Sequence, residues 1–391
     1  MNKVLITGGA GFIGAEIVEQ LYNTHEWEIT VLDLMSEQIH GKKWAESYLY
    51  NRIKGKCRFI KSDIRDYKAV RDAVKDNEHI IHLAAETGTG QSMYMINRYN
   101  DVNIMGTSNI LQAVSDLGQD SKVKKIILAS SRSVYGEGKY RCSQCGVVYP
   151  KSRKMENLCK GDFNLYCDKC GEKLEILLTS EECEIKPLSL YAFTKYSQEK
   201  LIETMCPALG VQYTIFRFQN VYGVGQSLKN PYTGILSIFS TLMLENKEIN
   251  IFEDGLESRD FINVKDVALG VIKSLTCTAS NSEVINLGSG EATTVIEIAQ
   301  ILKKIYESNS KLRISGDFRY GDIANNKADI SKAQRLLGFC PTVDLETGLN
   351  DFCKWVMNSD KDSNGYEKSI SEMEKAGMLR RGNGQTTENG K

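Results

Sequence analysis

The first third of the chain alternates short apolar runs with segments of helical spacing. Apolar residues recur with helical period in Ile13–Tyr22 and Tyr67–Lys75, which predicts two amphipathic helices. The runs between the helical segments are rich in β-branched residues and predict strands. They are Lys3–Thr7, Glu28–Asp33, Arg58–Ser62, Ile80–Ala84 and Lys125–Ser130. Strands that alternate with helices predict right-handed crossovers and an α/β fold with a doubly wound parallel sheet.

The rest of the chain is less regular. Helical spacing covers Met93–Gly118 and Tyr191–Met205, and a strand is expected at Tyr213–Phe218. A smaller C-terminal lobe is predicted from four further elements, at Thr233–Leu244, Ile249–Phe252, Val264–Leu275 and Val295–Tyr306. The expected division is an α/β core over 1–137, an insert over 138–184, the rest of the core over 185–222, a second lobe over 223–356 and a polar tail over 357–391. We expect this tail, with a weak helical pattern at Ile370–Leu379, to be mobile.

Composition and charge exclude several function classes. The 391 residues are 41% hydrophobic and 25% charged, with a formal net charge of −1, a balance typical of soluble globular proteins. Without an excess of basic residues, the chain as a whole has no field that attracts nucleic acid or an anionic membrane. Strand-like sequence begins at Val4, and no apolar run reaches membrane-spanning length. We therefore expect no signal peptide, no membrane span and a cytoplasmic location.

A glycine-rich turn connects the first strand to the first helix. Gly8, Gly11 and Gly14 have the spacing GxxGxxG, which permits a tight turn and a close approach of a pyrophosphate to the helix N-terminus. Asp33 ends the second strand, where a carboxylate accepts hydrogen bonds from an adenosine ribose. These features predict a Rossmann-type site. NAD is expected rather than NADP, because Asp33 would repel a 2′-phosphate and positions 34 to 36 supply no cation.

Asp63 and Ile64 follow the third strand, from where they would meet the adenine edge of the dinucleotide. For Asp63 there is an alternative interpretation. The helix at Tyr67–Lys75 follows closely, and an aspartate before a helix is a common N-cap.

Tyr191 and Lys195 are four residues apart and share one face of a predicted helix. An ammonium group near a phenol favours the phenolate, which lowers the pKa of the tyrosine toward the range of a working base. Ser131 follows the fifth strand, at the carboxyl edge where doubly wound sheets bind ligands. These three side chains are the candidate catalytic set.

Five motifs in order make the chain resemble the NAD-dependent epimerase/dehydratase family of extended short-chain dehydrogenases/reductases. They are GxxGxxG at 8–14, SSxxVYG at 130–136, YxxxK at 191–195, RFQNVYG at 217–223 and RDFINV at 259–264. The resemblance covers 1–356 apart from the insert, and it implies an NAD-binding core and a lobe that binds a nucleotide sugar. It implies that Ser131 hydrogen-bonds the reacting hydroxyl, that Tyr191 is the general base, and that Lys195 binds the ribose and activates Tyr191.

The resemblance also implies the contacts of both ligands. For NAD they are Gly8, Gly11, Phe12, Ile13, Gly14, Asp33, Asp63, Ile64, Leu83, Ala84, Ala85, Asn103 and Lys195. For the nucleotide sugar they are Thr87, Ser131, Arg132, Asn220, Arg259 and Arg319. Asn220, Arg259 and Arg319 are expected at its phosphates, since guanidinium groups match phosphate oxygens with paired donors; for each arginine a surface salt bridge is the alternative. The helices at Met93–Gly118 and Tyr191–Met205 resemble the family's dimer interface, so a homodimer is expected.

The residues after Ser131 bear on the reaction. Dehydratases of this family carry an Asp-Glu pair there, whereas this chain has Arg132-Ser133. Dehydration is therefore disfavoured, which leaves transient oxidation at C4 and 4-epimerisation, with net 4-dehydrogenation or 4-keto reduction as the alternative. The run AETGTGQSMY at 85–94 and the cysteine insert resemble a smaller branch, the dTDP-L-rhamnose 4-epimerases, and imply a dTDP-6-deoxyhexose substrate. A catalytically idle NAD-binding scaffold is the non-enzyme alternative, which the intact catalytic set opposes.

Four of the eleven cysteines form two CxxCG knuckles, Cys142 with Cys145 and Cys167 with Cys170. Four thiolates at this spacing suit a closed tetrahedral zinc site, and disulfides, the alternative, are disfavoured in a reducing compartment. We expect a structural zinc that holds the insert beside the catalytic set. Zinc ribbons elsewhere bind nucleic acid, but this insert mixes lysines with acidic residues, so no nucleic-acid partner is expected. The other cysteines are expected to be buried.

Overall fold

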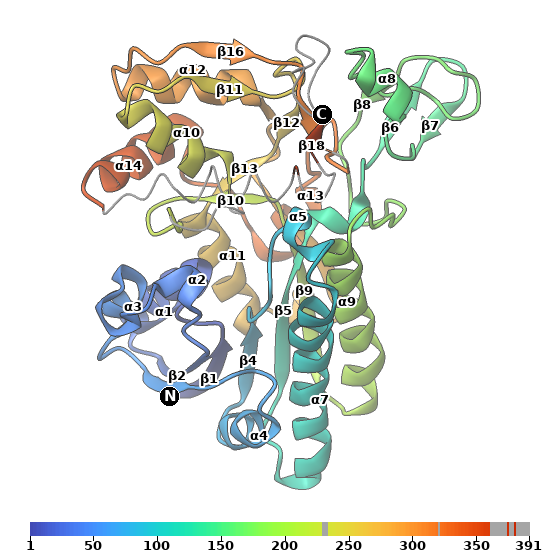
Figure 1. The fold of residues 1–391 in the computed structure, drawn as a ribbon. Helices are drawn as coiled ribbons and strands as arrows, with labels where there is room; N and C mark the ends of the chain where they lie inside the picture. The colour runs from blue at the N-terminus through green and yellow to red at the C-terminus, as the bar shows by residue number, and fades with distance from the viewer. Residues whose placement is uncertain (229–233, 320, 360–373, 375–378, 381–391) are drawn as a thin grey trace, which may run out of the picture.

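The computed structural model describes residues 1–228, 234–319, 321–359, 374 and 379–380 (Figure 1). A central sheet with helices on both faces forms the core, and a smaller lobe lies at one end of it. None of the helices in these described parts is long and apolar enough to cross a membrane.

The core sheet has seven strands, all parallel to their neighbours, in the order β14-β9-β5-β4-β1-β2-β3. They are β1 (Asn2–Thr7), β2 (Trp27–Asp33), β3 (Arg58–Lys61), β4 (His79–His82), β5 (Lys125–Ser131), β9 (Gln212–Phe218) and β14 (Glu283–Leu287). The predicted Rossmann-type parallel sheet is confirmed. From β1 the next strands in the sequence, β2 and β3, are added on one side, whereas β4, β5 and β9 are added on the other, so the strand order reverses between β1 and β4. The crevice at such a switch point is where doubly wound folds bind ligands.

Helices cover both faces of the sheet because successive strand residues point to opposite sides. Val4 and Ile6 of β1 belong to one core cluster, and Leu5 between them belongs to the other. The helices of the core are α1 (Phe12–Thr24), α2 (Glu37–His40), α3 (Tyr48–Ile53), α4 (Tyr67–Lys75), α5 (Thr89–Ser92), α6 (Ile96–Tyr99), α7 (Gly106–Leu117), α9 (Leu190–Ala208), α11 (Val264–Thr276) and α13 (Ser331–Leu337). A π-helical stretch at Asn100–Met105 joins α6 to α7, so the helix predicted over Met93–Gly118 is present from Ile96.

Three elements within residues 223–356, the range expected for the second lobe, belong to the core: α11, β14 and α13. Of these, only α11 was predicted as an element, at Val264–Leu275. Strand β14 extends the core sheet beside β9, and α11 packs on that sheet through Val267, Ala268 and Val271. Local periodicity indicates a helix or a strand, but not which of two apolar cores will take it up. The chain therefore returns to the core after it first enters the lobe.

The lobe has a core of its own, in which Phe239, Leu302 and Phe352 are buried. Its helices are α10 (Ile235–Leu244), α12 (Val295–Ile305) and α14 (Leu345–Met357). Its short strands are β10 (Asn220–Tyr222), β11 (Ile249–Ile251), β12 (Ser258–Arg259), β13 (Phe261–Asn263), β15 (Thr293–Thr294), β16 (Leu312–Ile314), β17 (Phe318–Arg319) and β18 (Leu379–Arg380). The predicted helical pattern at Ile370–Leu379 is wrong at Leu379, which is a strand residue paired with β17. Apart from residues 357–359, 374 and 379–380, the tail and its predicted mobility lie outside the described residues.

The insert forms a small antiparallel sheet in the order β7-β6-β8. Its elements are β6 (Tyr140–Cys142), β7 (Gly146–Val148), α8 (Met155–Cys159) and β8 (Glu175–Ile176). Tyr140, Leu165 and Leu174 are buried in its core. Cys159 of the insert and Cys340 are exposed, and Cys57 and Cys277 are half-buried. The expectation that the cysteines outside the knuckles are buried therefore holds only for Cys183, Cys206 and Cys353.

Candidate active site

The loop between β1 and α1 is packed so closely that glycine is required. Gly8 has φ +71°, and a Cβ there would lie 2.7 Å from the backbone nitrogen of Ala84. A Cβ on Gly14 would lie 2.5 Å from the Cα of Gly9 and 2.6 Å from the oxygen of Gly8. No side chain caps the N-terminus of α1, and its first turn carries no acidic residue. The positive end of the helix dipole and its N–H groups are therefore available to an anion.

A cavity of about 470 Å³ runs from this loop toward the predicted catalytic residues. Twelve of the thirteen predicted NAD contacts line it: Gly8, Gly11, Phe12, Ile13, Gly14, Asp33, Asp63, Ile64, Leu83, Ala84, Ala85 and Lys195. Tyr191 lines it too, with Thr87 and Asn220 from the predicted substrate set. One cavity thus combines an anion-binding loop with the candidate base.

Asp33 lies in the cavity wall with its carboxylate already oriented by the backbone. Oδ2 accepts from the nitrogen of Ala10 at 3.0 Å, and Oδ1 accepts from the nitrogen of Met35 at 2.8 Å. Burial raises the pKa of Asp33, and these N–H donors together with the nearby His40 oppose the rise. His40 also lines the cavity. Burial lowers the pKa of His40, and the nearby Asp33 carboxylate only partly opposes this. Sequence reasoning missed His40, because α2 alone brings it back toward β2.

Two predicted NAD contacts have other partners. The N-cap of α4 is Asp66, so the alternative interpretation of Asp63 as that cap is wrong. Asp63 instead pairs with Arg65, whose hydrogen bond lowers the pKa of Asp63. Asn103 is fully buried and lies outside the lining of the cavity. Its side chain donates to the oxygen of Glu86 and accepts from its nitrogen, so it fixes the backbone beside Ala85 and Thr87.

The three catalytic candidates meet at the carboxyl end of β5. Ser131 ends the strand, and its hydroxyl donates to the phenol oxygen of Tyr191 on the first turn of α9. Lys195, one turn further along α9, donates from Nζ to the oxygen of Ala129 at 2.9 Å. Burial lowers the pKa of Lys195 to about 7, and Glu199 opposes this. The sequence pattern placed Tyr191 and Lys195 on one helix face and Ser131 at the end of a strand, and the fold brings that strand end beside the helix.

The predicted direction of the Tyr191 pKa is wrong for the protein as it stands. Burial raises this pKa, and the Ser131 hydroxyl and the Arg132 cation only partly offset the rise. The ammonium of Lys195 donates to the Ala129 carbonyl, and burial lowers its own pKa to about 7. In this structure, therefore, the position of Lys195 one turn along the helix does not offset the effect of burial on Tyr191.

The predicted phosphate-binding residues lie outside the innermost cavity except for Asn220, whose buried Oδ1 has no hydrogen-bond partner among the described residues. Arg259 donates to the oxygens of Ile323 and Ala324 at 2.9 and 3.1 Å. Arg319 pairs with Asp322 at 2.7 Å and remains partly exposed. Arg259 is therefore no surface salt bridge, whereas the local ion pair of Arg319 fits that alternative in part.

Arg132 follows Ser131 directly and belongs to the same neighbourhood. Burial and the nearby Arg259 cation lower the pKa of Arg132 to about 9. Its guanidinium has no hydrogen bond or ion pair within the described parts of the chain. A half-buried guanidinium that has no hydrogen-bonded partner among the described residues, and that lies near a second cation, is an arrangement that an anion stabilises.

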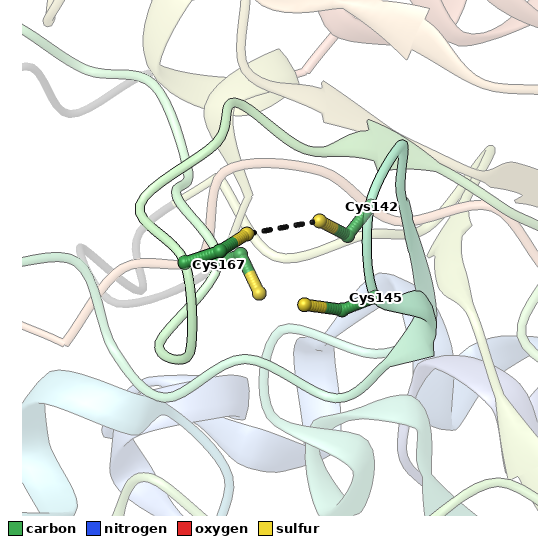
Figure 2. A group of neighbouring side chains, drawn as sticks. Cys142, Cys145 and Cys167 are labelled. Atoms are coloured by element: carbon green, nitrogen blue, oxygen red, sulfur yellow. Dashed lines mark hydrogen bonds between the residues drawn. The ribbon is translucent and has the colours of Figure 1, made fainter.

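The four knuckle cysteines converge in the insert, as Figure 2 shows for Cys142, Cys145 and Cys167. Their sulfur atoms and that of Cys170 all lie within 4.8 Å of one another. Backbone N–H groups of Lys169 and Cys170 donate to the sulfur of Cys167 and lower its pKa to about 7. All four positions are thiols, so a bound metal would have a complete tetrahedral set and no open position.

Two family models match the chain. The one described as GDP-mannose 4,6 dehydratase matches residues 5–152, and the one described as NAD dependent epimerase/dehydratase family matches residues 168–288. A dTDP-L-rhamnose 4-epimerase of Burkholderia thailandensis is 35% identical over 91% of this chain and 95% of its own. A UDP-glucuronate 4-epimerase of Thermodesulfobacterium geofontis is 30% identical over 91% and 96%.

Solved structures give the same result. A UDP-glucuronic acid 4-epimerase from Bacillus cereus, in complex with UDP-glucuronic acid and NAD, superposes with a TM-score of 0.74 at 26% identity and covers 91% of this chain and 99% of its own. A UDP-glucose 4-epimerase from Thermotoga maritima with UDP-glucose has a TM-score of 0.72 at 28% identity and covers the same shares. With these relatives, the glycine loop and the Ser131, Tyr191 and Lys195 set, the chain belongs to the NAD-dependent epimerase/dehydratase family of enzymes.

Proposed function

We propose that this enzyme is an NAD-dependent nucleotide-sugar 4-epimerase that acts on a dTDP-6-deoxyhexose such as dTDP-L-rhamnose. The observation that carries the proposal is that Tyr191, with the Ser131 hydroxyl beside its phenol, lines a cavity that begins at the glycine loop. The dTDP-L-rhamnose 4-epimerase at 35% identity supports the choice of sugar. Related chains that act on UDP-sugars leave the nucleotide base for experiment to decide.

The residues that hold NAD fit a dinucleotide. The uncapped N-terminus of α1 faces a loop that a Cβ would fill, which suits a pyrophosphate. Asp33, whose carboxylate is oriented by backbone N–H groups, would accept from the ribose hydroxyls and disfavour a 2′-phosphate. Lys195, with Nζ near the carboxyl edge of β5, would donate to the other ribose. Bound NAD would supply a reversible hydride acceptor for C4 of the sugar.

Tyr191 is the base that removes the proton from the reacting hydroxyl of the sugar. Its phenolate takes the proton of the C4 hydroxyl while the Ser131 hydroxyl donates a hydrogen bond and orients the reacting oxygen. The same two groups return the proton after the sugar presents its other face. Elimination of water needs an acid and a base at the two positions after Ser131, and this chain has Arg132 and Ser133 there. The chain therefore lacks the side chains that would catalyse dehydration at these positions.

The diphosphate of the substrate is bound by Asn220, Arg259 and Arg319, with Arg132 nearest the sugar. The guanidinium of Arg132, which has no hydrogen bond or ion pair within the described residues, is the observation in favour. Guanidinium groups offer phosphate oxygens parallel donors that a single ammonium cannot.

The insert binds one structural zinc through Cys142, Cys145, Cys167 and Cys170. Four sulfur atoms within 4.8 Å of one another support this, because they can close on one ion with little movement. Metal analysis of the purified protein tests it, with about one zinc per chain as the expected result.

The protein forms a homodimer through the helices near Ile96–Leu117 and α9. Five large apolar side chains on or beside these helices are exposed: Met93, Tyr94, Ile96, Met105 and Phe193. Burial of such side chains between two copies would stabilise a dimer, and the mass of the protein in solution tests this.

The reaction is tested by incubating the purified protein with a panel of dTDP- and UDP-sugars and analysing the products by NMR. Inversion at C4 without added reductant is the expected outcome. A 4-keto sugar formed together with NADH would instead establish the dehydrogenase.

A further inference from the structure

The insert and the C-terminal lobe meet at a buried arginine. Arg153 lies between β7 and α8 of the insert, and 2% of its side chain is exposed. Its guanidinium forms a two-pronged ion pair with Glu253, which follows β11 of the lobe: Nη2 donates to Oε1 at 2.8 Å, and Nη1 donates to Oε2. Nε lies 4.0 Å from Oε1 of Glu137, which is also buried. In Figure 1 the insert accordingly lies beside β12 and β18 of the lobe.

The same guanidinium holds a loop of the lobe, residues 321–328. Nη2 of Arg153 donates to the carbonyl oxygen of Asp322 at 2.9 Å. Two residues later, the nitrogen of Ala324 donates to Oε2 of Glu137 at 2.8 Å. The side chain of Ala324 lies in the apolar core of the insert, beside Cys142 and Cys167. The conformation of this loop therefore depends on contacts with the insert and with Glu137.

The opposite side of the loop holds the arginines of the proposed diphosphate site. Arg259 donates to the carbonyl oxygens of Ile323 and Ala324. Arg319 pairs with the carboxylate of Asp322. Each of the two arginines is thus one hydrogen bond away from a residue that Arg153 or Glu137 binds.

Charge explains why Arg153 cannot be lost without movement. Its guanidinium stands between the carboxylates of Glu253 and Glu137, both almost fully buried. Removal of the cation would leave two buried carboxylates without it, and such a site relaxes by letting water in or by shifting the chain. The loop that Arg153 and Glu137 hold is the part of the chain that such a shift would move.

We propose that Arg153 is a positioning residue for the nucleotide sugar, through which the cysteine insert becomes a working part of the substrate site. Arg153 fixes the loop 321–328, and the loop fixes Arg259 and Arg319 in the positions from which they bind the diphosphate. This rests on the proposed function in one respect, namely that the substrate carries a nucleoside diphosphate.

The test measures binding of dTDP and UDP to the full chain by calorimetry, for Arg153→Ala, for Glu253→Gln and for the matched control Arg141→Ala. Arg141 is an exposed arginine on β6 of the same insert. We expect a tenfold or larger rise in Kd in the first two variants, no change in the control, and unchanged affinity for NAD in all three. In turnover, KM should rise more than kcat falls. Glu253→Gln removes the charge of Glu253 but keeps the shape of its side chain beside Arg153. If the affinities of this variant for dTDP and UDP stay at the wild-type level, the proposal is overturned, even if Arg153→Ala fails to fold.

A mutant cycle separates positioning from general damage to the insert. If Arg153 acts through Arg259 and Arg319, then Arg153→Ala should cost little further affinity for dTDP in a chain that already carries Arg259→Ala and Arg319→Ala. Effects that simply multiply would overturn the proposal. Wild-type turnover is a separate readout: an enzyme that binds dTDP in this Arg153-dependent way but inverts no sugar would sustain this inference and refute the epimerase.

Discussion

Alanine at Gly14 should separate cofactor affinity from stability. A Cβ at this position would lie 2.5 Å from the Cα of Gly9, 2.6 Å from the oxygen of Gly8 and 2.8 Å from the carbonyl carbon of Gly9. All three atoms are backbone, so no side chain can rotate away. Overpacking of this kind costs about 1–3 kcal/mol, while replacing a helical glycine by alanine gains about 1 kcal/mol. The net loss of unfolding free energy is therefore about 0–2 kcal/mol.

Affinity for NAD has no such compensation. The clash is relieved only if the glycine loop moves away from α1, and these two segments form the proposed pyrophosphate site. With about 1.4 kcal/mol per factor of ten, a strain of about 1–3 kcal/mol expressed at the site raises the Kd of NAD by about 5- to 150-fold. Calorimetric titration with NAD and thermal unfolding of the same preparation measure both quantities.

Gly55→Ala is the matched contrast. Gly55 has φ +79°, and a Cβ there would meet no atom within 4 Å. It should lose about 1 kcal/mol of stability from the left-handed backbone and keep its affinity for NAD. Wild-type NAD affinity in Gly14→Ala would refute the argument that contact between the loop and α1 shapes the phosphate site.

Three further predictions concern the base, the choice of cofactor and the metal. Tyr191→Phe should lose most turnover while binding NAD normally, and near-normal kcat in this variant would mean that another residue is the base. Because burial raises the pKa of Tyr191, kcat of the wild type should rise with pH as the phenolate forms. Asp33→Asn should narrow the preference for NAD over NADP, and since the pKa of Asp33 is also raised, the wild-type preference should weaken as pH falls; a preference equal to wild type in the variant would remove Asp33 from this role. Cys142→Ser should lower the zinc content and weaken dTDP binding before NAD binding, whereas a zinc-free variant with full activity would contradict a structural metal.

The parts of the account that depend on neighbouring residues were predictable from the sequence. Three features are local, since each needs only a few residues and a known period: the turn at Gly8, the helix that starts after Gly11, and the placement of Tyr191 and Lys195 one turn apart on a helix. Each cysteine knuckle is local as well. Each supplies two thiols, and a tetrahedral metal site needs four, so the sequence predicted that the two knuckles meet.

Long-range relations were not predictable. The return of β14 to the core sheet depends on competition between two apolar cores, which no local pattern reveals. The direction of the Tyr191 pKa depends on burial and on where the Lys195 ammonium points. The ion pair between Arg153 and Glu253 joins residues a hundred positions apart, and in the sequence Arg153 is one basic residue among several in the insert.

The most direct test of the central claim follows deuterium placed at C4 of dTDP-L-rhamnose. An epimerase that oxidises C4 and returns the same hydride within one site should give the C4-inverted sugar with its deuterium retained, with no need for stoichiometric NAD and no net formation of NADH. Tyr191→Phe provides the control for uncatalysed exchange. Loss of the deuterium to solvent, or a 4-keto sugar that accumulates with one NADH for each turnover, would contradict the account.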